Sequence, residues 1–491
     1  MAKVPRGVVA AGHPVTAEAG AQVLRDGGNA VDAAICSVLT SCVAESPLTG
    51  LGAGGFMLLH LPGASPADVL IDFFVAAGGA DGAERGSELV PIDVDFGDQT
   101  QVFNIGAASC GVPGLPAGIE WIAERYGSVP LERLAAPGAR IAREGVEVNE
   151  QQAYLLEILA PILTAKPEGA AIYAPAGHPL ERGEVFRWPD ASDALERLAA
   201  EGSTPFYAGE VGSAVAAWVR ERGGTLGVDD LAAYEPIERE PVASRFRGAD
   251  VLTNPPPSSG GILIAHALSV LERLGPESGV AELVEATEAA NAMRTGEFAE
   301  KLHEPGYRLG STTHISAIDP GGMCASVTCS NGTGSGEIVP GTGVHVNNML
   351  GETDLNPGGF HRIPAGRRVS SMMAPTVALR DGEVVLGLGS AGSNRVRSAI
   401  LGVAVRVLEQ GMDAADAVDA PRIHLEDGTL QAEPGVDETG LDRVESRGVP
   451  VVRWSRRNLF FGGVQAVVRD PATGELTAGG DPRRGGTVAF A

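Results

Sequence analysis

The chain has 491 residues and a net charge of −25, from 37 basic and 62 acidic side chains. Such acidity argues against a nucleic-acid or anionic-membrane partner, because both attract basic surfaces. A hydrophobic content of 44% with only 5% aromatic residues predicts a globular core of alanine, valine and leucine. The length allows two or three ordinary domains or one large α/β unit.

Five cysteines in apolar settings and the lack of any CxxC pair predict reduced, buried thiols and no zinc ribbon. The N-terminus lacks the long apolar run of a signal peptide. The longest apolar stretch, Ala33–Val43, is too short to cross a bilayer and predicts a buried helix. We therefore expect a soluble, cytoplasmic protein.

The first third of the chain alternates between helical and strand patterns. Val15–Arg25 has helical spacing, and Asn29 with Asp32 three residues later predicts the capped start of a second helix. Gly54–His60 and Asp68–Phe74 read as strands. Gly50–Gly55 matches GxGxxG, but a helix precedes this segment and a strand follows it, which is the reverse of a dinucleotide-binding unit.

Helices dominate the middle of the predicted fold. Residues 118–152 have a helical pattern broken near Gly127 and at Pro137-Gly138, and 153–250 is predicted to be mainly helical. Pro255–Gly261 predicts a rigid turn into another helix. Beyond it the pattern changes to short strands with two more helices; the strands are Pro375–Leu379, Val384–Leu388, Val464–Val468 and Thr487–Phe490, and the helices are Asn394–Glu409 and Ala414–Ala420. We expect one interdependent unit of sheets covered by helices.

Thr312 opens the most informative segment. Thr313–Ile318 and Met323–Cys329 have the composition of strands, and turn residues separate them. A hairpin centred near Gly321 places Thr312 opposite Ser330, so a threonine at a strand start faces a second hydroxyl. His314 would share that face and is interpreted as a structural histidine. GxSxG and HExxH are absent, and nothing implies a metal or an organic cofactor.

Two other segments suit anion binding. Gly389–Arg395 lies between a predicted strand and a predicted helix, where free backbone N–H groups and the helix dipole favour a carboxylate or a developing oxyanion. Ser370-Ser371 follows Arg367-Arg368, and hydroxyls beside guanidinium groups suit a carboxylate. A plain loop and a solvated turn are the competing interpretations.

Taken together, these segments resemble the γ-glutamyltranspeptidase family of N-terminal-nucleophile hydrolases nearly from end to end. The matching segments are His13-Pro14, Gly27–Ala34, Gly54–Met57, Gly111–Gly114, Pro255–Gly261, Thr312–Ser316, Asn347-Asn348, Ser370–Met372, Ala420–His424 and Asp481–Gly486.

The resemblance implies an α+β fold, a four-layer αββα sandwich, made as an inactive precursor. The precursor would cut itself between Ser311 and Thr312. The products would be a large chain, 1–311, and a small catalytic chain, 312–491, which remain together as a heterodimer. The freed α-amino group of Thr312 would act as the base for its own hydroxyl.

The resemblance also implies roles for individual residues. Ser330 matches the hydroxyl that hydrogen-bonds the nucleophile, and Gly392 and Ser393 match the oxyanion-binding pair. The residues that match the family's donor-binding positions are Ser370, Ser371, Glu352 and, with one deletion nearby, Asn331. The family's donor-binding arginine is replaced here by Phe74. Arg367 or Arg368 would then hold the donor carboxylate instead.

The expected activity is hydrolysis or transfer of the γ-glutamyl group of glutathione-like small amides, with water or an amine as acceptor. Phe74 favours an alternative with another acyl donor, such as an oxamate-type amidohydrolase, an acylase or a biosynthetic homologue. A non-cleaving homologue that only binds ligands is the remaining alternative.

Overall fold

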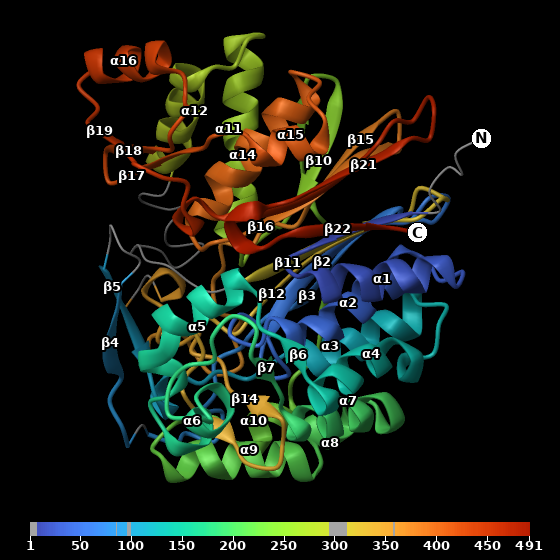
Figure 1. The fold of residues 1–491 in the computed structure, drawn as a ribbon, viewed down its shortest axis with the longest axis vertical. Coiled ribbons are helices and arrows are strands. Elements are labelled where there is room, and N and C mark those ends of the chain that lie inside the picture. The colour runs from blue at the N-terminus through green and yellow to red at the C-terminus, as the bar shows by residue number, and fades with distance from the viewer. Residues whose placement is uncertain (1–6, 85, 96–99, 294–311, 357–358) are drawn as a thin grey trace.

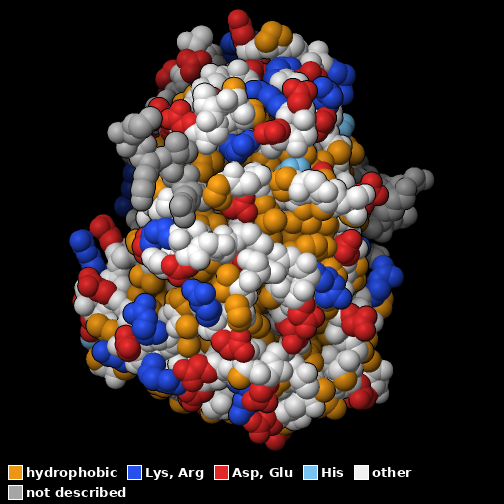
Figure 2. Space-filling model, turned by 90° about the vertical axis from the view of Figure 1, so that its right-hand side faces the viewer, with side chains coloured by type: hydrophobic (Ala, Val, Ile, Leu, Met, Phe, Trp, Pro, Cys, Tyr) orange, Lys and Arg blue, Asp and Glu red, His pale blue; other side chains and the backbone are white. Residues whose placement is uncertain are grey.

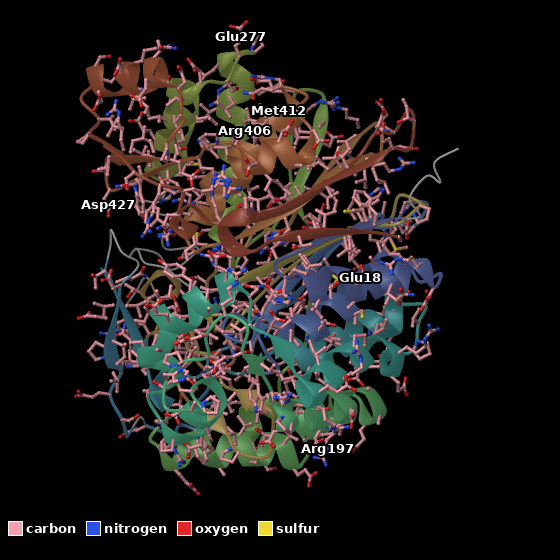
Figure 3. All side chains as sticks on the ribbon, viewed as in Figure 1. Glu18, Arg197, Glu277, Arg406, Met412 and Asp427 are labelled. Atoms are coloured by element: carbon pink, nitrogen blue, oxygen red, sulfur yellow. The ribbon has the colours of Figure 1, made fainter. Side chains whose placement is uncertain are left out.

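In the computed structural model, two β-sheets pack face to face between layers of helices (Figure 1). The structure describes residues 7–84, 86–95, 100–293, 312–356 and 359–491. Figure 3 marks Glu18 and Arg406 in the helical layers on the two sides of the sheets. The mixed helix-and-sheet class predicted from the sequence is confirmed.

Segments from distant parts of the chain alternate in the larger sheet. Its seven strands are, in spatial order, β22 (Thr487–Phe490), β1 (Val8–Ala11), β11 (Thr313–Ile318), β12 (Cys324–Ser330), β2 (Gly54–His60), β3 (Asp68–Phe73) and β8 (Ile237–Arg239). All of its neighbouring strands pair antiparallel. β11, β12 and β2 are buried on both faces, which explains their nearly continuous apolar sequences.

The second sheet faces the first through β16 and β20. Its six strands are, in order, β21 (Leu476–Gly480), β20 (Gly463–Arg469), β16 (Glu383–Ala391), β15 (Thr376–Arg380), β10 (Ala249–Thr253) and β9 (Val242–Phe246). β8, β9 and the first residues of β10 lie in the region 153–250 that was predicted to be mainly helical, and that prediction is wrong for residues 237–250. These short strands carry charged side chains between apolar ones, so the apolar pattern of a strand is weak.

Helices cover the outer face of each sheet. Those on the side of the larger sheet are α1 (Pro14–Arg25), α2 (Ala30–Ala44), α3 (Leu115–Tyr126), α4 (Leu131–Glu144), α5 (Glu150–Leu163), α6 (Pro167–Tyr173), α7 (Pro189–Glu201), α8 (Thr204–Tyr207), α9 (Glu210–Glu221) and α10 (Val228–Ala232). Those on the other side are α11 (Ser259–Leu274), α12 (Val280–Ala292), α14 (Arg395–Leu408), α15 (Ala414–Asp419) and α16 (Glu438–Ser446). α4 runs through Pro137, so the predicted break there is wrong.

Smaller elements complete the described chain. They are the pairs β4 (Val90–Asp95) with β5 (Thr100–Ile105), β6 (Val146–Glu147) with β7 (Val185–Phe186) and β13 (Ile338–Val339) with β14 (Val344–His345); the three-stranded sheet β17 (Ile423–Glu426), β18 (Thr429–Ala432) and β19 (Val451–Arg453); and the 3₁₀ turns Ala107–Ser109, Thr353–Leu355, Leu459–Phe461 and Pro482–Arg484.

α2 is the predicted buried helix, and every residue in it is buried. Its start is held by the predicted capping box, in which Asn29 Oδ1 accepts from the Asp32 N–H and Asp32 Oδ2 accepts from the Asn29 N–H, both at 2.9 Å. The Asp32 carboxylate also accepts from the backbone and hydroxyl of Ser128. Because this buried carboxylate accepts hydrogen bonds from both segments, it joins α2 to the loop before α4.

The remaining sequence expectations concern thiols and surface charge. All five cysteines are buried and free, as predicted. Burial raises the pKa of Cys36, Cys42 and Cys110 to about 12, which makes them poor nucleophiles. Figure 2 shows acidic and basic side chains interspersed on the visible face. Among the described residues, no helix has both the length and the apolar character needed to cross a membrane.

Candidate active site

The β11–β12 hairpin determines the position of Thr312. Thr313 lies opposite Cys329, and the register continues without a shift to Ile318 opposite Cys324. The next pair at the open end is Thr312 with Ser330, so the predicted register is confirmed. Both residues are buried, with 5% and 2% of their surface exposed, and both line one cavity between the sheets. Ser311 lies outside the described residues.

Gly392 and Ser393 form a turn at the wall of the same cavity. β16 ends at Ala391 and α14 begins at Arg395, as the predicted strand-to-helix turn requires. Both turn residues have positive φ, +121° for Gly392 and +53° for Ser393. A Cβ on Gly392 would lie 2.8 Å from the backbone Cα of Gly462, so only glycine fits. The turn places backbone N–H groups at the positive end of a fourteen-residue helix.

The cavity is small, and polar and apolar residues both line it. The space open to the centre of a water molecule is about 30 Å³. The polar wall consists of Thr312, Ser330, Gly332, Glu352, Ser371 and Ser393. The apolar wall consists of Phe74, Met349, Leu355, Met372, Met373 and Val396. Apart from Phe74, these apolar residues were given no role from the sequence, although Met372 lies in the matching segment Ser370–Met372.

Phe74, predicted from the sequence to stand in place of the family's donor-binding arginine, lines this cavity. Its ring is fully buried and stacks on Phe56, with centroids 5.2 Å apart and 24° between the planes. Its backbone N–H donates to Asp72 Oδ1 at 2.9 Å. The lining of the cavity therefore includes an aromatic ring that is held in place by packing and by the backbone.

The predicted donor-binding residues are divided between two places. Glu352 and Ser371 line the cavity with Thr312, and Glu352 Oε1 accepts from the Thr333 N–H at 3.3 Å. Ser370 and Arg367 line a neighbouring cavity instead, and the Ser370 hydroxyl donates to the carbonyl of Leu355 at 2.9 Å. Their roles in donor binding stay predictions.

Asn331 and Arg368 also lie away from the cavity with Thr312. Asn331 is buried and donates through Nδ2 to the carbonyl of His345 at 3.0 Å. Arg368 is held by Asp72, with its Nε 3.2 Å from Oδ1, and its guanidinium group stacks 4.3 Å above the ring of Tyr234. These contacts give Arg368 a fixed position beside the site.

His314 has the structural role that its sequence context suggested. Its Nδ1 lies 2.8 Å from Thr328 Oγ1 and its Nε2 lies 2.9 Å from Ser316 Oγ. Burial lowers its pKa to about 3, so the ring is neutral at physiological pH. Both ring nitrogens therefore form hydrogen bonds in the space between the two sheets.

Glu45 supports the residue next to Thr312 and was not singled out from the sequence. It ends α2, has 4% of its surface exposed, and accepts from Thr313 Oγ1 at 2.5 Å and from Thr16 Oγ1 at 2.9 Å. Burial raises its pKa to about 7, against the opposing effect of these two hydrogen bonds. An acidic residue at the end of a mostly apolar helix was the available signal.

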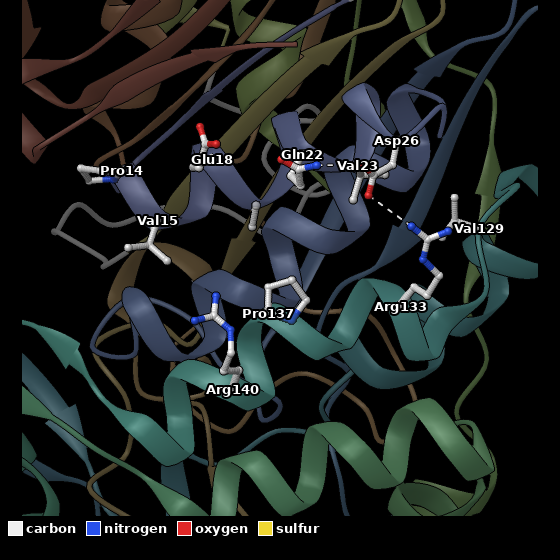
Figure 4. A pocket seen from close by; sticks show the side chains of 11 residues that line it. Pro14, Val15, Glu18, Gln22, Val23, Asp26, Val129, Arg133, Pro137 and Arg140 are labelled. Atoms are coloured by element: carbon white, nitrogen blue, oxygen red, sulfur yellow. Dashed lines mark hydrogen bonds and ion pairs between the residues drawn. The ribbon is translucent and has the colours of Figure 1, made fainter.

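A larger cavity, about 530 Å³, lies on the outer helical layer and is unrelated to this site. It separates α1 from α4, and Figure 4 shows the ion pair of Asp26 with Arg133 across it. Its other lining side chains include Val15, Glu18 and Arg140. The lining contains no serine, threonine, cysteine or histidine, so it offers no nucleophile for acyl transfer.

Comparison with known proteins matches these features to one family. The γ-glutamyltranspeptidase family model matches residues 16–306 and 297–491. The acylase ACY 1 proenzyme of Pseudomonas sp. (strain SE83) is 32% identical, over 98% of this chain and 93% of its own. The glutathione hydrolase proenzyme of Escherichia coli (strain K12) is 27% identical, over 98% and 91%. The crystal structure of cephalosporin acylase from Bacillus halodurans superposes with a TM-score of 0.83 at 26% identity, covering 99% of this chain and 96% of that one.

Glu45 predicts a pH dependence of stability. Its pKa in the folded protein, about 7, exceeds its ordinary value of 4.5, so folding favours the protonated form. The associated stabilisation, about 3 kcal/mol, is complete below pH 4.5 and is lost as the pH rises through 7. In Glu45→Gln this term is absent, so its thermal midpoint relative to wild type should rise between pH 5 and pH 8.

The matched control is Glu18→Gln, which changes an exposed carboxylate on α1. Its midpoint should follow wild type at every pH. If Glu45→Gln also runs parallel to wild type, the carboxyl group is not protonated on folding.

Proposed function

The chain belongs to the γ-glutamyltranspeptidase family, and from this we propose that it is a self-cleaving N-terminal threonine hydrolase acting on small amides. Its main reaction is hydrolysis or transfer of the γ-glutamyl group of glutathione-like donors through an acyl-Thr312 intermediate. The observation that carries the proposal is that Thr312, Ser330 and the Gly392-Ser393 turn meet at one buried cavity. The proenzyme names of its relatives support processing of this chain as well.

Cleavage between Ser311 and Thr312 gives chains 1–311 and 312–491, which stay together. Both sheets support this association, because each contains strands from before and after Thr312. In the larger sheet, β1 pairs with both β11 and β22, and β2 pairs with β12. The two chains would therefore have to break interior strand pairs in order to separate.

In the proposed reaction Thr312 supplies both the nucleophile, which is its hydroxyl, and the base, which is its α-amino group. The α-amino group of Thr312 takes the proton of the Thr312 hydroxyl, and the oxygen attacks the carbonyl carbon of the donor amide. The tetrahedral oxyanion accepts hydrogen bonds from the N–H groups of Gly392 and Ser393. The C–N bond then breaks, the amine leaves with the proton, and Thr312 carries the acyl group as an ester. Water or an acceptor amine attacks this ester and restores the hydroxyl.

The polar wall orients the donor. Ser330 donates to the nucleophile oxygen, Glu352 pairs with the donor's ammonium group, and Ser371 contacts its carboxylate. Glu352 is almost fully buried, so a charged partner is favoured there over water. Hydrolysis of small amides requires no macromolecular partner other than the enzyme's own second chain.

A second candidate function is favoured by Phe74. The Phe56–Phe74 stack and the methionines of the lining give the acyl group of a donor an apolar wall to pack against. Such a wall suits methylene groups better than a charged carboxylate. An acylase that accepts an aliphatic acyl group through the same Thr312 chemistry would fit this wall, and two of the similar proteins are acylases by name.

A panel of p-nitroanilides tests the proposal. The processed enzyme should release p-nitroaniline from γ-glutamyl p-nitroanilide, and the burst should leave the acyl group on the peptide that begins at Thr312. Aliphatic acyl anilides of matched length serve as the alternative donors, and faster turnover of these favours the acylase reading. Turnover without any acyl group on Thr312 would contradict the proposal.

Gly392→Ala tests the oxyanion turn. Its methyl group cannot be accommodated beside Gly462, so the backbone N–H groups must shift. Loss of one such donor commonly lowers the rate about 10²-fold to 10³-fold, and kcat should fall by that amount. Gly411→Ala is the control, because Gly411 also has positive φ but open space around it. Cleavage is checked first on a gel; equal kcat in both fully cleaved variants would exclude the turn from catalysis.

A further inference from the structure

A small cavity lies between α12, α14 and the strands β17 and β18, and it shares no lining residue with the cavity at Thr312. The space in it that is open to the centre of a water molecule is about 20 Å³, which is enough for one water molecule or one monoatomic ion. Arg406 of α14, marked in Figure 3, and Arg422, just before β17, are among its lining residues. None of the described residues that line it is acidic.

Both arginines have one buried N–H group without a hydrogen-bond partner in the described part of the chain. Arg422, with 3% of its surface exposed, donates from Nη1 to the carbonyl of Phe461 at 3.2 Å and from Nη2 to that of Val418 at 3.0 Å, which leaves its Nε–H. Arg406 donates from Nη2 to the carbonyl of Pro421, which leaves Nη1. Buried donors are paired in nearly all folded proteins, so these two require an acceptor.

The charged groups around these arginines leave one positive charge without a counterpart. Arg483 Nε lies 2.7 Å from Glu433 Oε1, and its Nη1 lies 3.2 Å from Asp481 Oδ1. Arg422 Nη2 also pairs with Asp481. Burial, and then the charges of Arg422 and Arg483, lower the pKa of Arg406 to about 10, so it is still protonated at neutral pH. Three guanidinium groups and two carboxylates therefore leave an excess of +1.

The neighbouring groups do not supply the missing negative charge. Glu426 at the end of β17 accepts from Asn394 Nδ2 at 2.8 Å and lies 3.0 Å from His424 Nε2. Arg395 and Arg397, in the first turn of α14, are buried and add further positive charge. An anion from solution is therefore the available counterpart.

A halide ion meets both requirements, because it accepts from the two N–H groups and carries one negative charge. A water molecule would accept from the same groups but would leave the excess charge buried beside the apolar lining, which includes Leu401, Leu425 and Leu430. A carboxylate or a phosphate has too many atoms for this volume. We propose that the cavity is a halide site, occupied by chloride in ordinary salt, in which the ion bridges Arg406 Nη1 and Arg422 Nε.

The ion would lie where segments from before and after Thr312 meet. Leu283, Val284 and Thr287 of α12 line the cavity from the earlier segment, and residues of α14, β17 and β18 line it from the later one. An ion that binds only the folded protein stabilises it. Because the site is separate from the cavity at Thr312, halide should raise the stability and leave kcat unchanged.

The first test compares two sodium salts at equal concentration. Sodium bromide supplies a halide, and sodium gluconate supplies an anion of the same charge that is too large for the cavity. The measured quantity is the thermal midpoint of the purified protein in bromide minus that in gluconate. This difference should be positive and should grow by about 1 °C for each tenfold rise in salt concentration, given the unfolding entropy of a chain of 491 residues.

A pair of variants identifies the charge that is responsible. Arg406→Gln removes one donor and the excess charge together, so it should abolish the difference between the two salts. Arg380→Gln is the matched control, because Arg380 also donates to a backbone carbonyl, that of Leu408 at the end of α14, but does not line the cavity. Its difference should equal that of wild type.

A crystal of the wild-type protein grown in bromide locates the ion. Anomalous scattering from bromine should give a peak within hydrogen-bond distance of both Arg406 Nη1 and Arg422 Nε. This measurement needs no variant, so it decides the inference even if Arg406→Gln does not fold.

The inference is overturned if bromide is found only at the protein surface and the cavity holds water. It is also overturned if wild type has the same midpoint in both salts, or if Arg406→Gln keeps the full difference, since a peak in the cavity would then be an adventitious ion only. None of these results bears on acylation of Thr312, so the proposed function would stand.

Discussion

The antiparallel pairing of β11 with β12 is the constraint on which the site depends. Side chains alternate between the faces of a strand, so the register decides which side each residue faces. Thr312 and His314 point between the two sheets, whereas Thr313 points toward α2 and is held there by Glu45. A slip of one residue would exchange these faces and move the nucleophile out of the cavity. Such a slip would break the buried hydrogen bonds of Thr313 with Glu45 and of His314 with Thr328 and Ser316, which opposes it.

The second constraint is that strands from before and after Thr312 share both sheets. Neither part can complete its own core, because β11 and β12 lie between β1 and β2 in the larger sheet. The fold must therefore form from the whole chain before any cut is made. The same arrangement gives the site its parts: β12 contributes Ser330, the turn after β16 contributes Ser393, and Phe74 follows the end of β3.

Local features of the fold could be predicted from the sequence, and long-range ones could not. The capping box of α2 follows from residues three positions apart. The pair of Thr312 with Ser330 follows from the tight turn between β11 and β12, because such a turn fixes the register of the two strands that it joins. The strands β8, β9 and β10 were missed, since their pairing partners lie far away in the chain. The sequence also placed Ser370 and Ser371 together, whereas the structure turns them toward different cavities. The contact of Arg368 with Asp72 spans 296 residues, so no local pattern reveals it.

The most direct test of the central claim is the identity of the new N-terminus in the purified protein. Intact-mass measurement and N-terminal sequencing should find two chains of about 32 and 18 kDa, in proportion to their shares of the 50.3 kDa chain, and the smaller should begin at Thr312. The Thr312→Ala variant should remain a single chain without amidase activity. An intact wild-type chain that still hydrolyses amides, or a new N-terminus at another residue, would contradict the account.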